Sequence, residues 1–510
     1  MSGGRVARTW AVALTGLRGE LVDVEADITA QTPEFRIIGM GDQALREAHR
    51  RVMNACENSD MRLPDRRVTV NLSPAALPKQ GTGFDLAIAL AAVATEGLMS
   101  VDSLARTLHI GELGLDGRLR PVPGVLPAVH AAARRGFDRF VVPHANLAEA
   151  ELVPGVEVLG AASLAQVARW HGADIDVPDV EPVPGEALVL RAGDRSDLSE
   201  IVGQPAAVEA LIAAAAGGHH VLMSGPPGAG KTMLARRLPG ILPALDDEAA
   251  LEVASLRSLA GEPVTALDRT PPFEAPHHSA SVAALVGGGS RTARPGAIAR
   301  ASRGVLFVDE AAEAPGGVLD ALRQPLEQGR IEIHRAGFRA EFPARFQLVL
   351  ATNPCPCGEY GVRGGTCTCA PSVVRRYLAK LSGPLLDRMD IDLRLQRVAS
   401  TREDGGPRVS TAQARERVAA ARERAAHRLR GTPWRVNADV PGAWLRQGPR
   451  PIAAEARRTL EVALQRGAIT LRGYDRILRL AWTLADLAGR DEPAAADVGQ
   501  ALFLKKGVTR

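Results

Sequence analysis

The stretch GPPGAGKT, from Gly225 to Thr232, decides the fold of this chain. It follows the apolar run HHVLMS and precedes the helical run MLARRL, which is the strand–loop–helix context that a phosphate-binding loop requires. Its glycines let backbone N–H groups surround a phosphate at a helix N-terminus. Lys231 then supplies positive charge to the β- and γ-phosphates, and Thr232 offers a hydroxyl to Mg²⁺. We therefore expect ATP and Mg²⁺ as cofactors, with nucleotide contacts from Gly225, Pro226, Pro227, Gly228, Ala229, Gly230, Lys231 and Thr232.

Two further apolar strands end in polar side chains that suit ATP hydrolysis. The run GVLFVDE ends in Asp309 and Glu310, and the run FQLVLATN ends in Asn353. An acid at a strand tip can hold Mg²⁺, and the next acid can polarise the attacking water. We expect Asp309 and Glu310 to take these two roles and Asn353 to orient the water near the γ-phosphate.

Arg388 lies in SGPLLDRMD, just before the next apolar strand. A cation that does not serve its own subunit's phosphate site often completes the site of a neighbour, so Arg388 predicts a ring of subunits. The alternative is a surface ion pair with Asp387 or Asp390.

Strand and helix patterns divide the 510 residues into three domains. Residues 1–172 alternate short strands with alanine-rich helices and predict an α/β domain, and residues 173–196 have the composition of a linker. Residues 197–397 contain buried strands separated by helices, which predicts a parallel sheet, and residues 398–510 are helical. No apolar run approaches the roughly 20 residues of a membrane span, so we expect a cytoplasmic protein without membrane contact.

Four of the five cysteines lie in NPCPCGEYGVRGGTCTCAP, immediately after Asn353. They form two C-x-C pairs, whereas zinc sites usually have two residues between paired cysteines. The alternatives are one tetrahedral Zn²⁺, free or redox-sensitive thiols, and two disulfides. A cytoplasmic compartment disfavours the disulfides. Our prediction is a structural Zn²⁺ clip on this loop, held by Cys355, Cys357, Cys367 and Cys369.

A hairpin signal precedes the strand that ends in Asn353. RIEIHRAGFRAEFPARFQL reads as two alternating strands around Ala336 and Gly337. In a ring, the arginines of this hairpin could follow DNA phosphates while an aromatic side chain stacks on a base. The DNA-contact candidates are Arg335, Phe338 and Arg339, and the upstream stretch adds Arg291, Arg294, Arg300 and Arg303. A solvated basic face of an arginine-rich protein is the alternative.

Together these residues resemble the AAA+ ATPases and, more narrowly, the magnesium-chelatase-like family in its ComM/YifB branch. The resemblance covers essentially the whole chain and rests most on NLSPAALPKQGTGFDLAIAL, APHHSASVAALVGGGS, RPGAIARASRGVLFVDE, ATNPCPCG and LRGYDRILRLAWTLADL. It implies that Asp309 and Glu310 form the Walker B pair, that Asn353 is sensor 1 and that Arg388 is the arginine finger. It also implies that Arg472 is the sensor 2 arginine of a helical lid, with Arg476 as the competing candidate.

The N-terminal domain resembles the proteolytic domain of Lon and the similar domain of the recombination protein RadA. The position of the Lon nucleophilic serine falls on Gly83, and that of its partner lysine falls on Leu126. A serine nucleophile needs a base within reach, so these replacements exclude a Lon-type protease. A catalytic pair shifted to Thr82 and Lys79 has no other support in the sequence. We expect this domain to serve as a structural collar or a binding surface.

Three functions are compatible with an ATPase of this kind. The first is a ring-forming DNA translocase or helicase that drives branch migration in homologous recombination or DNA uptake. The others are the motor subunit of a metal-inserting chelatase and a nucleotide-switched scaffold for a protein partner. The Lon-like collar and the cysteines, which chelatase motors typically lack, favour the first. The expected partners are single-stranded or branched DNA, further copies of the chain in a ring, which we expect to be a hexamer, and recombination proteins.

Overall fold

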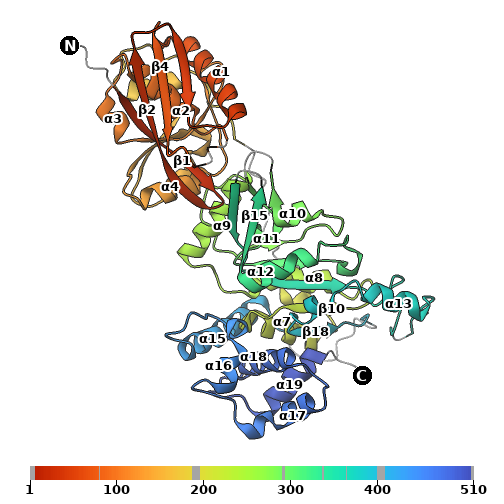
Figure 1. The fold of residues 1–510 in the computed structure, drawn as a ribbon. Helices are drawn as coiled ribbons and strands as arrows, with labels where there is room; N and C mark the ends of the chain where they lie inside the picture. The colour runs from red at the N-terminus through yellow and green to blue at the C-terminus, as the bar shows by residue number, and fades with distance from the viewer. Residues whose placement is uncertain are drawn as a thin grey trace.

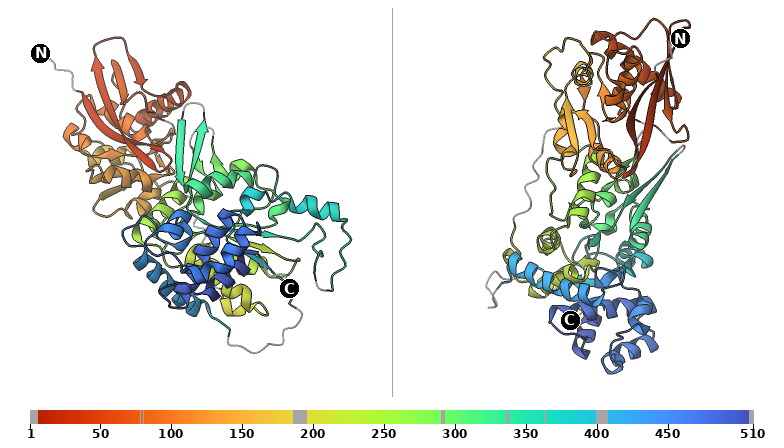
Figure 2. Two further views of the ribbon diagram at one scale, coloured as in Figure 1. Left: turned by 60° about the horizontal axis from the view of Figure 1, so that its bottom comes forward. Right: turned by 90° about the vertical axis from the view of Figure 1, so that its left-hand side faces the viewer.

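The computed structural model describes residues 6–77, 79, 81–185, 196–289, 293–335, 338–362, 364–398 and 408–506. Three units follow one another, and the central one lies between the N-terminal unit and the helical C-terminal unit (Figures 1 and 2). This arrangement confirms the predicted fold class: an α/β domain, a P-loop domain with a parallel sheet, and a helical region.

The N-terminal unit is built on a seven-stranded mixed sheet of order β3-β4-β2-β1-β5-β8-β9. Helix α2 is buried along its whole length, as expected for DLAIALAAVA, which is apolar on every face after its first residue. The strands are β1 (Ala7–Thr15), β2 (Arg18–Thr29), β3 (Glu34–Ile38), β4 (Arg67–Ser73), β5 (Leu108–His109), β8 (Arg139–Pro143) and β9 (Glu157–Ala161), and β6 (Glu112–Leu113) pairs with β7 (Leu119–Arg120). The helices are α1 (Asp42–Asn58), α2 (Asp85–Ala94), α3 (Val101–Ala105), α4 (Val125–Ala133), α5 (Leu147–Ala150) and α6 (Leu164–Trp170).

Polar side chains of β1, β5, α3 and the residue after α6 form a chain of contacts inside this unit. His109 lies between Thr9, whose Oγ1 is 2.7 Å from Nδ1, and His171, whose Nε2 is 2.8 Å from Nε2 of His109. The other ring nitrogen of His171 is 2.9 Å from Oγ of Ser103. Burial lowers the pKa of His109 well below its ordinary value and that of His171 to about 4. Both imidazoles are therefore neutral at pH 7.

The central unit holds a five-stranded, all-parallel sheet of order β11-β14-β17-β10-β18. Because parallel strands share one carboxyl edge, the P-loop after β10, Asp309 after β14 and Asn353 after β17 meet there. The strands are β10 (Val221–Ser224), β11 (Phe273–Glu274), β14 (Val305–Val308), β17 (Gln347–Thr352) and β18 (Ile391–Arg394). The helices are α7 (Pro205–Gly217), α8 (Lys231–Ile241), α9 (Asp247–Ala260), α10 (Val282–Val286), α11 (Ala297–Arg300), α12 (Arg323–Gln328), α13 (Pro371–Leu378) and α14 (Gly383–Leu386).

Two hairpins project from this unit. β15 (Arg330–Arg335) pairs antiparallel with β16 (Phe338–Pro343), with His334 opposite Arg339, and β12 (Gly287–Gly288) pairs with β13 (Arg294–Pro295). The turn predicted at Ala336 and Gly337 lies outside the described residues, as do the side chains of Arg335 and Phe338. Figure 2 shows β15 and β16 reaching towards the N-terminal unit.

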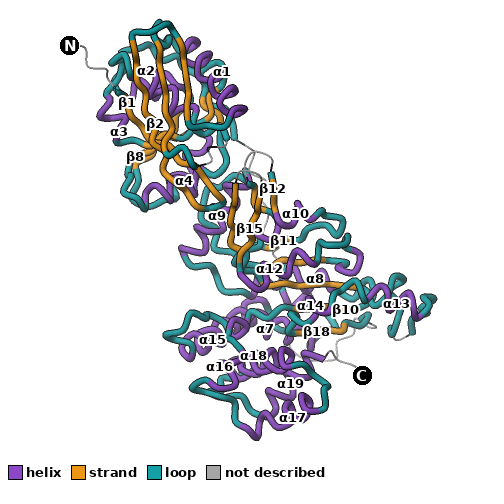
Figure 3. Tube along the Cα trace, in the orientation of Figure 1, coloured by secondary structure: helices purple, strands orange, loops and turns teal. Residues whose placement is uncertain are grey.

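The C-terminal unit is a helical bundle (Figure 3). Its first helix is capped by Ser410, which forms a capping box with Gln413. Trp482 and other buried residues of α18 share one apolar cluster with residues of α7 and α8. The helices are α15 (Thr411–Arg428), α16 (Gly442–Gln447), α17 (Ala454–Gln465), α18 (Leu471–Leu487) and α19 (Ala495–Lys506). Among the described residues, no helix has the length and apolar character needed to cross a bilayer.

The N-terminal unit touches the central unit at two places. The β1–β2 turn lies against the β15–β16 hairpin, where Leu14 and Leu17 pack on the apolar cluster that includes the hairpin's inner face. At Gly16, φ is +65°, and an added Cβ would lie 2.2 Å from the carbonyl oxygen of Glu341. At the second place, the N–H of Gly124, before α4, donates to the carbonyl of Ser258 in α9 at 3.0 Å. The predicted collar is thus joined to the hairpin itself.

Candidate active site

The P-loop cation and the predicted sensor are brought together. The Lys231 ammonium donates to Oδ1 of Asn353 at 3.0 Å and to the carbonyls of Gly225 and Pro226 at 2.6 and 3.1 Å. Burial lowers the pKa of Lys231 from its ordinary value, while Asp309 and Glu310 oppose this shift. The side chains from β10 and β17 therefore converge on one point, as the shared edge of the parallel sheet requires.

A pair of hard oxygen donors lies beside this point. Thr232 donates its hydroxyl to Oδ2 of Asp309 at 2.7 Å, and Oδ1 of Asp309 accepts the N–H of Glu310 at 2.9 Å. A hydroxyl and a carboxylate at the mouth of a phosphate loop are the donor set that Mg²⁺ takes alongside phosphate oxygens. These two side chains fit the cation predicted from the sequence.

Glu310 has a partner that the sequence did not reveal. Its backbone is left-handed, with φ of 49°, which is uncommon outside glycine. Its Oε2 lies 2.9 Å from Nδ1 of His278, in the segment that follows β11. Because β11 neighbours β14 in the sheet, that segment must emerge next to Glu310. The signal was present in APHHSAS, but β11 has only two residues and does not stand out as a strand.

Arg388 belongs to a cluster of cations. It forms an ion pair with Glu327 of α12, and not with either aspartate expected from the sequence, and it donates to the carbonyl of Pro384 at 2.5 Å. Burial and the nearby charges of Arg472, Arg476 and Arg323 lower its pKa. The structure thus places the predicted finger and the predicted sensor 2 arginine close to each other.

The two candidates for sensor 2 differ in their partners. Arg476 forms an ion pair at 2.6 Å with Asp390, whose side chain is only 1% exposed. Arg472 is exposed and, within the described part of the chain, makes no hydrogen bond or ion pair. Of the two, Arg472 is therefore the one able to receive an external anion.

The four clustered cysteines face one another. Their Sγ atoms all lie within 4.8 Å, with separations of 3.3 Å for Cys355–Cys357, 3.8 Å for Cys355–Cys367 and 3.7 Å for Cys357–Cys367. All four are free thiols, since a disulfide would require about 2.05 Å. A tetrahedral zinc with Zn–S distances of about 2.3 Å has edges of about 3.8 Å, so the set fits one Zn²⁺.

The cysteine loop also rests on the P-loop, a contact that the sequence did not predict. A Cβ added to Gly358 would lie 2.5 Å from Cδ of Pro227, so the ring of Pro227 packs against the backbone of Gly358. The next residue, Glu359, forms an ion pair at 2.6 Å with Arg397, beyond β18. The loop therefore spans from the P-loop to the edge of the sheet.

Two of the arginines expected to face DNA are engaged inside the central unit, which corrects that expectation. Arg300 pairs with Glu274 at 3.0 Å, and Arg303 pairs with Glu252 at 2.8 Å. Arg294 is exposed, whereas Arg291 lies outside the described residues. On the hairpin, the Arg339 side chain is 61% exposed and donates to Glu332 at 2.7 Å.

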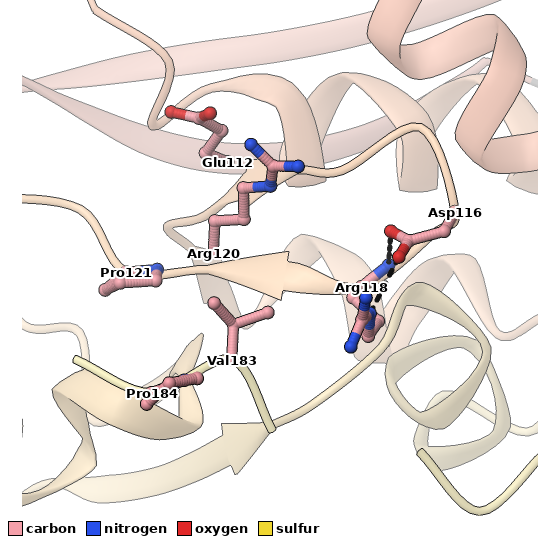
Figure 4. A pocket seen from close by; sticks show the side chains of 7 residues that line it. All are labelled: Glu112, Asp116, Arg118, Arg120, Pro121, Val183 and Pro184. Carbon is pink, nitrogen blue, oxygen red and sulfur yellow. Dashed lines mark hydrogen bonds and ion pairs between the residues drawn. The ribbon is translucent and has the colours of Figure 1, made fainter. Parts of the chain in front are cut away.

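Thr82 and Lys79, the residues considered as a shifted catalytic pair, do not contact each other among the described residues. Thr82 donates to Glu112, whereas Lys79 donates to backbone carbonyls of Pro74 and Leu77, so the two side chains serve different partners. Beside Glu112 lies a cavity of about 480 Å³ (Figure 4). One wall comes from the β6–β7 hairpin and the other from the linker, and its lining residues are Glu112, Asp116, Arg118, Arg120, Pro121, Val183 and Pro184.

Three family descriptions match successive parts of the chain. Residues 24–146 match "Subunit ChlI of Mg-chelatase", residues 197–403 match "Magnesium chelatase, subunit ChlI", and residues 408–505 match "Magnesium chelatase, subunit ChlI C-terminal". Together they extend over all three units.

Similar proteins cover nearly the full length. An uncharacterized protein of Mycobacterium tuberculosis is 48% identical over 99% of this chain and 100% of its own. Competence protein ComM of Haemophilus influenzae is 38% identical over 98% of this chain and 97% of its own, and the uncharacterized protein YifB of Escherichia coli is 38% identical over 94% and 93%. The Lon protease of Mycolicibacterium smegmatis is 28% identical over 34% of this chain and 22% of its own, in keeping with the Lon-like character of one domain.

Proposed function

Because this chain belongs to the magnesium-chelatase-like family of AAA+ ATPases, in its ComM/YifB branch, we propose that it is a ring-forming DNA translocase that drives branch migration. The observation that supports the motor most directly is the convergence of Lys231, Asn353 and the Thr232–Asp309 pair at one edge of the parallel sheet. This edge holds every side chain needed to bind a nucleoside triphosphate.

Each residue of the site has a defined task in hydrolysis. Lys231 binds the β- and γ-phosphates, and its partner Asn353 orients the attacking water. Thr232 and Asp309 would hold Mg²⁺, which neutralises charge on the phosphates when bound. The Glu310 carboxylate accepts the proton of the attacking water.

The cation cluster supports a ring. The charge of Arg472 lowers the pKa of Arg388, so the two cations lie near each other, and Glu327 is the carboxylate that Arg388 contacts within this chain. The triphosphate of an adjacent copy would bind Arg388, as the finger, in place of Glu327, with Arg472 beside it. We expect six copies.

The contact between collar and hairpin supports DNA as the track. The hairpin carries Arg335, Phe338 and Arg339 next to its turn, and the β1–β2 turn packs on the hairpin farther from that end. A relative that covers nearly the whole chain is described as a competence protein. A chelatase motor or a protein scaffold is the alternative.

ATP turnover measured with and without forked DNA tests the proposal, together with strand exchange on three-stranded substrates. We expect DNA to raise turnover, and the double variant Arg335→Glu with Arg339→Glu to lose this stimulation while basal hydrolysis persists. Arg458→Glu with Arg466→Glu, two exposed positions of the lid, is the matched control and should behave as wild type. If DNA leaves the rate of ATP turnover unchanged at every salt concentration, the translocase function is refuted and the alternatives are favoured.

We further propose that Cys355, Cys357, Cys367 and Cys369 hold one structural Zn²⁺. Metal analysis of protein purified without a histidine tag, under reducing conditions, should find about one zinc per chain. A value near zero would refute the site.

A further inference from the structure

We infer that the cavity between the β6–β7 hairpin and the linker binds a small zwitterion with an apolar side chain, the chemistry of an α-amino acid. The cavity has a volume of about 480 Å³, which lies within the range of small-molecule sites in proteins. It shares no residue with the candidate active site, so the inference goes beyond the proposed function.

Both walls of the cavity are held in place by packing. On the hairpin, Leu113 and Leu119 pair across the two strands and point into the core, where they are buried. The linker is anchored on either side of the cavity. Val177 packs on the apolar core of the N-terminal unit, and a Cβ added to Gly185 would lie 3.5 Å from Cβ of Ala145. The linker therefore follows a defined course past the hairpin.

Arg120 presents an unpaired guanidinium to this cavity. Arg120 and Glu112 are opposite each other in the β6–β7 pair and, because strand side chains alternate, both point to the face away from the core. The two do not form an ion pair, and the Glu112 carboxylate instead accepts the hydroxyl of Thr82. Figure 4 shows the Arg120 side chain extending towards Glu112 without a contact. Since Arg120 has no hydrogen-bond or ion-pair partner in the part of the chain that the structure describes, it is able to bind the carboxylate of a ligand.

The charges around the cavity favour a zwitterion over an anion. Nε of Arg118 donates to Oδ2 of Asp116 at 2.7 Å, so these two charges satisfy each other. The remaining charges are those of Arg120 and Glu112, and the carboxylate of Glu112 repels any further negative charge that approaches Arg120. Opposite residues of an antiparallel pair have Cβ atoms about 5 Å apart, so one small ligand can offer a carboxylate to the arginine and an ammonium to the glutamate.

The rest of the lining is apolar. Val183 and Pro184 of the linker and Pro121, which follows β7, complete the cavity. They give an aliphatic side chain a surface on which to be buried from water. Leucine is the simplest ligand that combines all three features. It would join the linker to the hairpin, because its charged groups bind β6 and β7 while its side chain contacts the linker.

Isothermal titration calorimetry of the full chain tests this inference, with leucine and leucyl-leucine as probes and with inorganic phosphate and uncharged N-acetyl-leucine amide for comparison. We expect saturable binding of at least one of the two probes with a Kd of about 1 mM or below, and the tighter probe shows whether a free amino acid or a short peptide is preferred. Phosphate and the uncharged amide should bind at least about tenfold more weakly. Arg120→Gln should weaken binding about 10- to 100-fold, because a hydrogen bond to a charged group is lost, and Glu112→Gln should also weaken it.

Two further variants separate loss of the ligand's partner from loss of the fold. Arg120→Lys keeps the charge and should retain part of the affinity, whereas Arg106→Gln, which replaces an exposed arginine after α3, is the matched control and should bind as wild type does. The inference is overturned if neither probe binds saturably up to about 10 mM, if Arg120→Gln binds as tightly as wild type, or if phosphate binds as tightly as leucine. The titration contains neither ATP nor DNA, so its outcome is independent of the proposed translocase function.

Discussion

The substitution Gly16→Ala should detach the N-terminal unit from the β15–β16 hairpin. The added Cβ would lie 2.2 Å from the carbonyl oxygen of Glu341, so the two backbones must separate by about 0.8 Å to reach a tolerable 3.0 Å. The positive φ of Gly16 adds about 1–2 kcal/mol of strain for any residue with a Cβ. Separation also exposes part of Leu14 and Leu17, each contributing about 1 kcal/mol for a half-buried side chain. The expected loss in docking free energy is about 2 kcal/mol beyond the backbone strain.

Gly136→Ala is the matched control, because Gly136 also has positive φ but nothing lies within 4 Å of its added Cβ. Amide hydrogen exchange of residues 330–335 and 338–343 is the assay. The alanine at position 16 should accelerate exchange in this hairpin about 30-fold, whereas the alanine at position 136 should leave it unchanged. Equal exchange in the two variants would refute the docking described here. DNA-stimulated turnover, measured alongside, should fall only for Gly16→Ala.

Three other predictions concern the remaining sites. Burial alone would raise the pKa of the Asp390 carboxyl, and the ion pair with Arg476 holds it well below its ordinary value. Arg476→Ala leaves this buried carboxylate without its main cation and should destabilise the protein by about 3–5 kcal/mol in denaturant unfolding. A loss of stability below about 1 kcal/mol would contradict this. Cys355→Ser should abolish zinc content. It should also weaken binding of an ATP analogue, because the cysteine loop rests on the P-loop. Unchanged binding in a zinc-free variant would show that this contact does not affect nucleotide binding. The pKa of about 4 for His171 lies below the unfolded value of about 6.5, so the unfolded chain binds more protons between these pH values and stability falls as pH drops through them. From pH 7 to 5 this histidine alone should remove about 2 kcal/mol, measured by urea unfolding at each pH, and a flat profile would contradict the buried pair.

The sequence predicted those features that depend on local pattern. The P-loop, Asp309 and Asn353 were found because each follows a strand of continuous apolar residues, and parallel strands bring their carboxyl ends together.

The features that escaped prediction depend on contacts between distant residues. Arg303 reads as a free cation until Glu252, 51 positions earlier, is folded against it. His278 was missed because the strand before it, β11, has only two residues and shows no pattern. The partner of Arg388, Glu327, comes from α12, far away in the sequence. Hydrophobic periodicity carries no information about such pairings.

The apolar cluster that α15 and α18 share with α7 and α8 couples the C-terminal unit to the phosphate loop. Helix α15 packs on α7 and on α8, the helix that begins at Lys231, and α18 packs on α7, so the C-terminal unit and the central unit share one apolar core. A displacement of the C-terminal helices would therefore change the packing of α8, the helix that follows the phosphate loop. A chain that ends at residue 397 would accordingly expose apolar side chains of α7 and α8, so we expect it to unfold more easily around the phosphate loop than the full chain does.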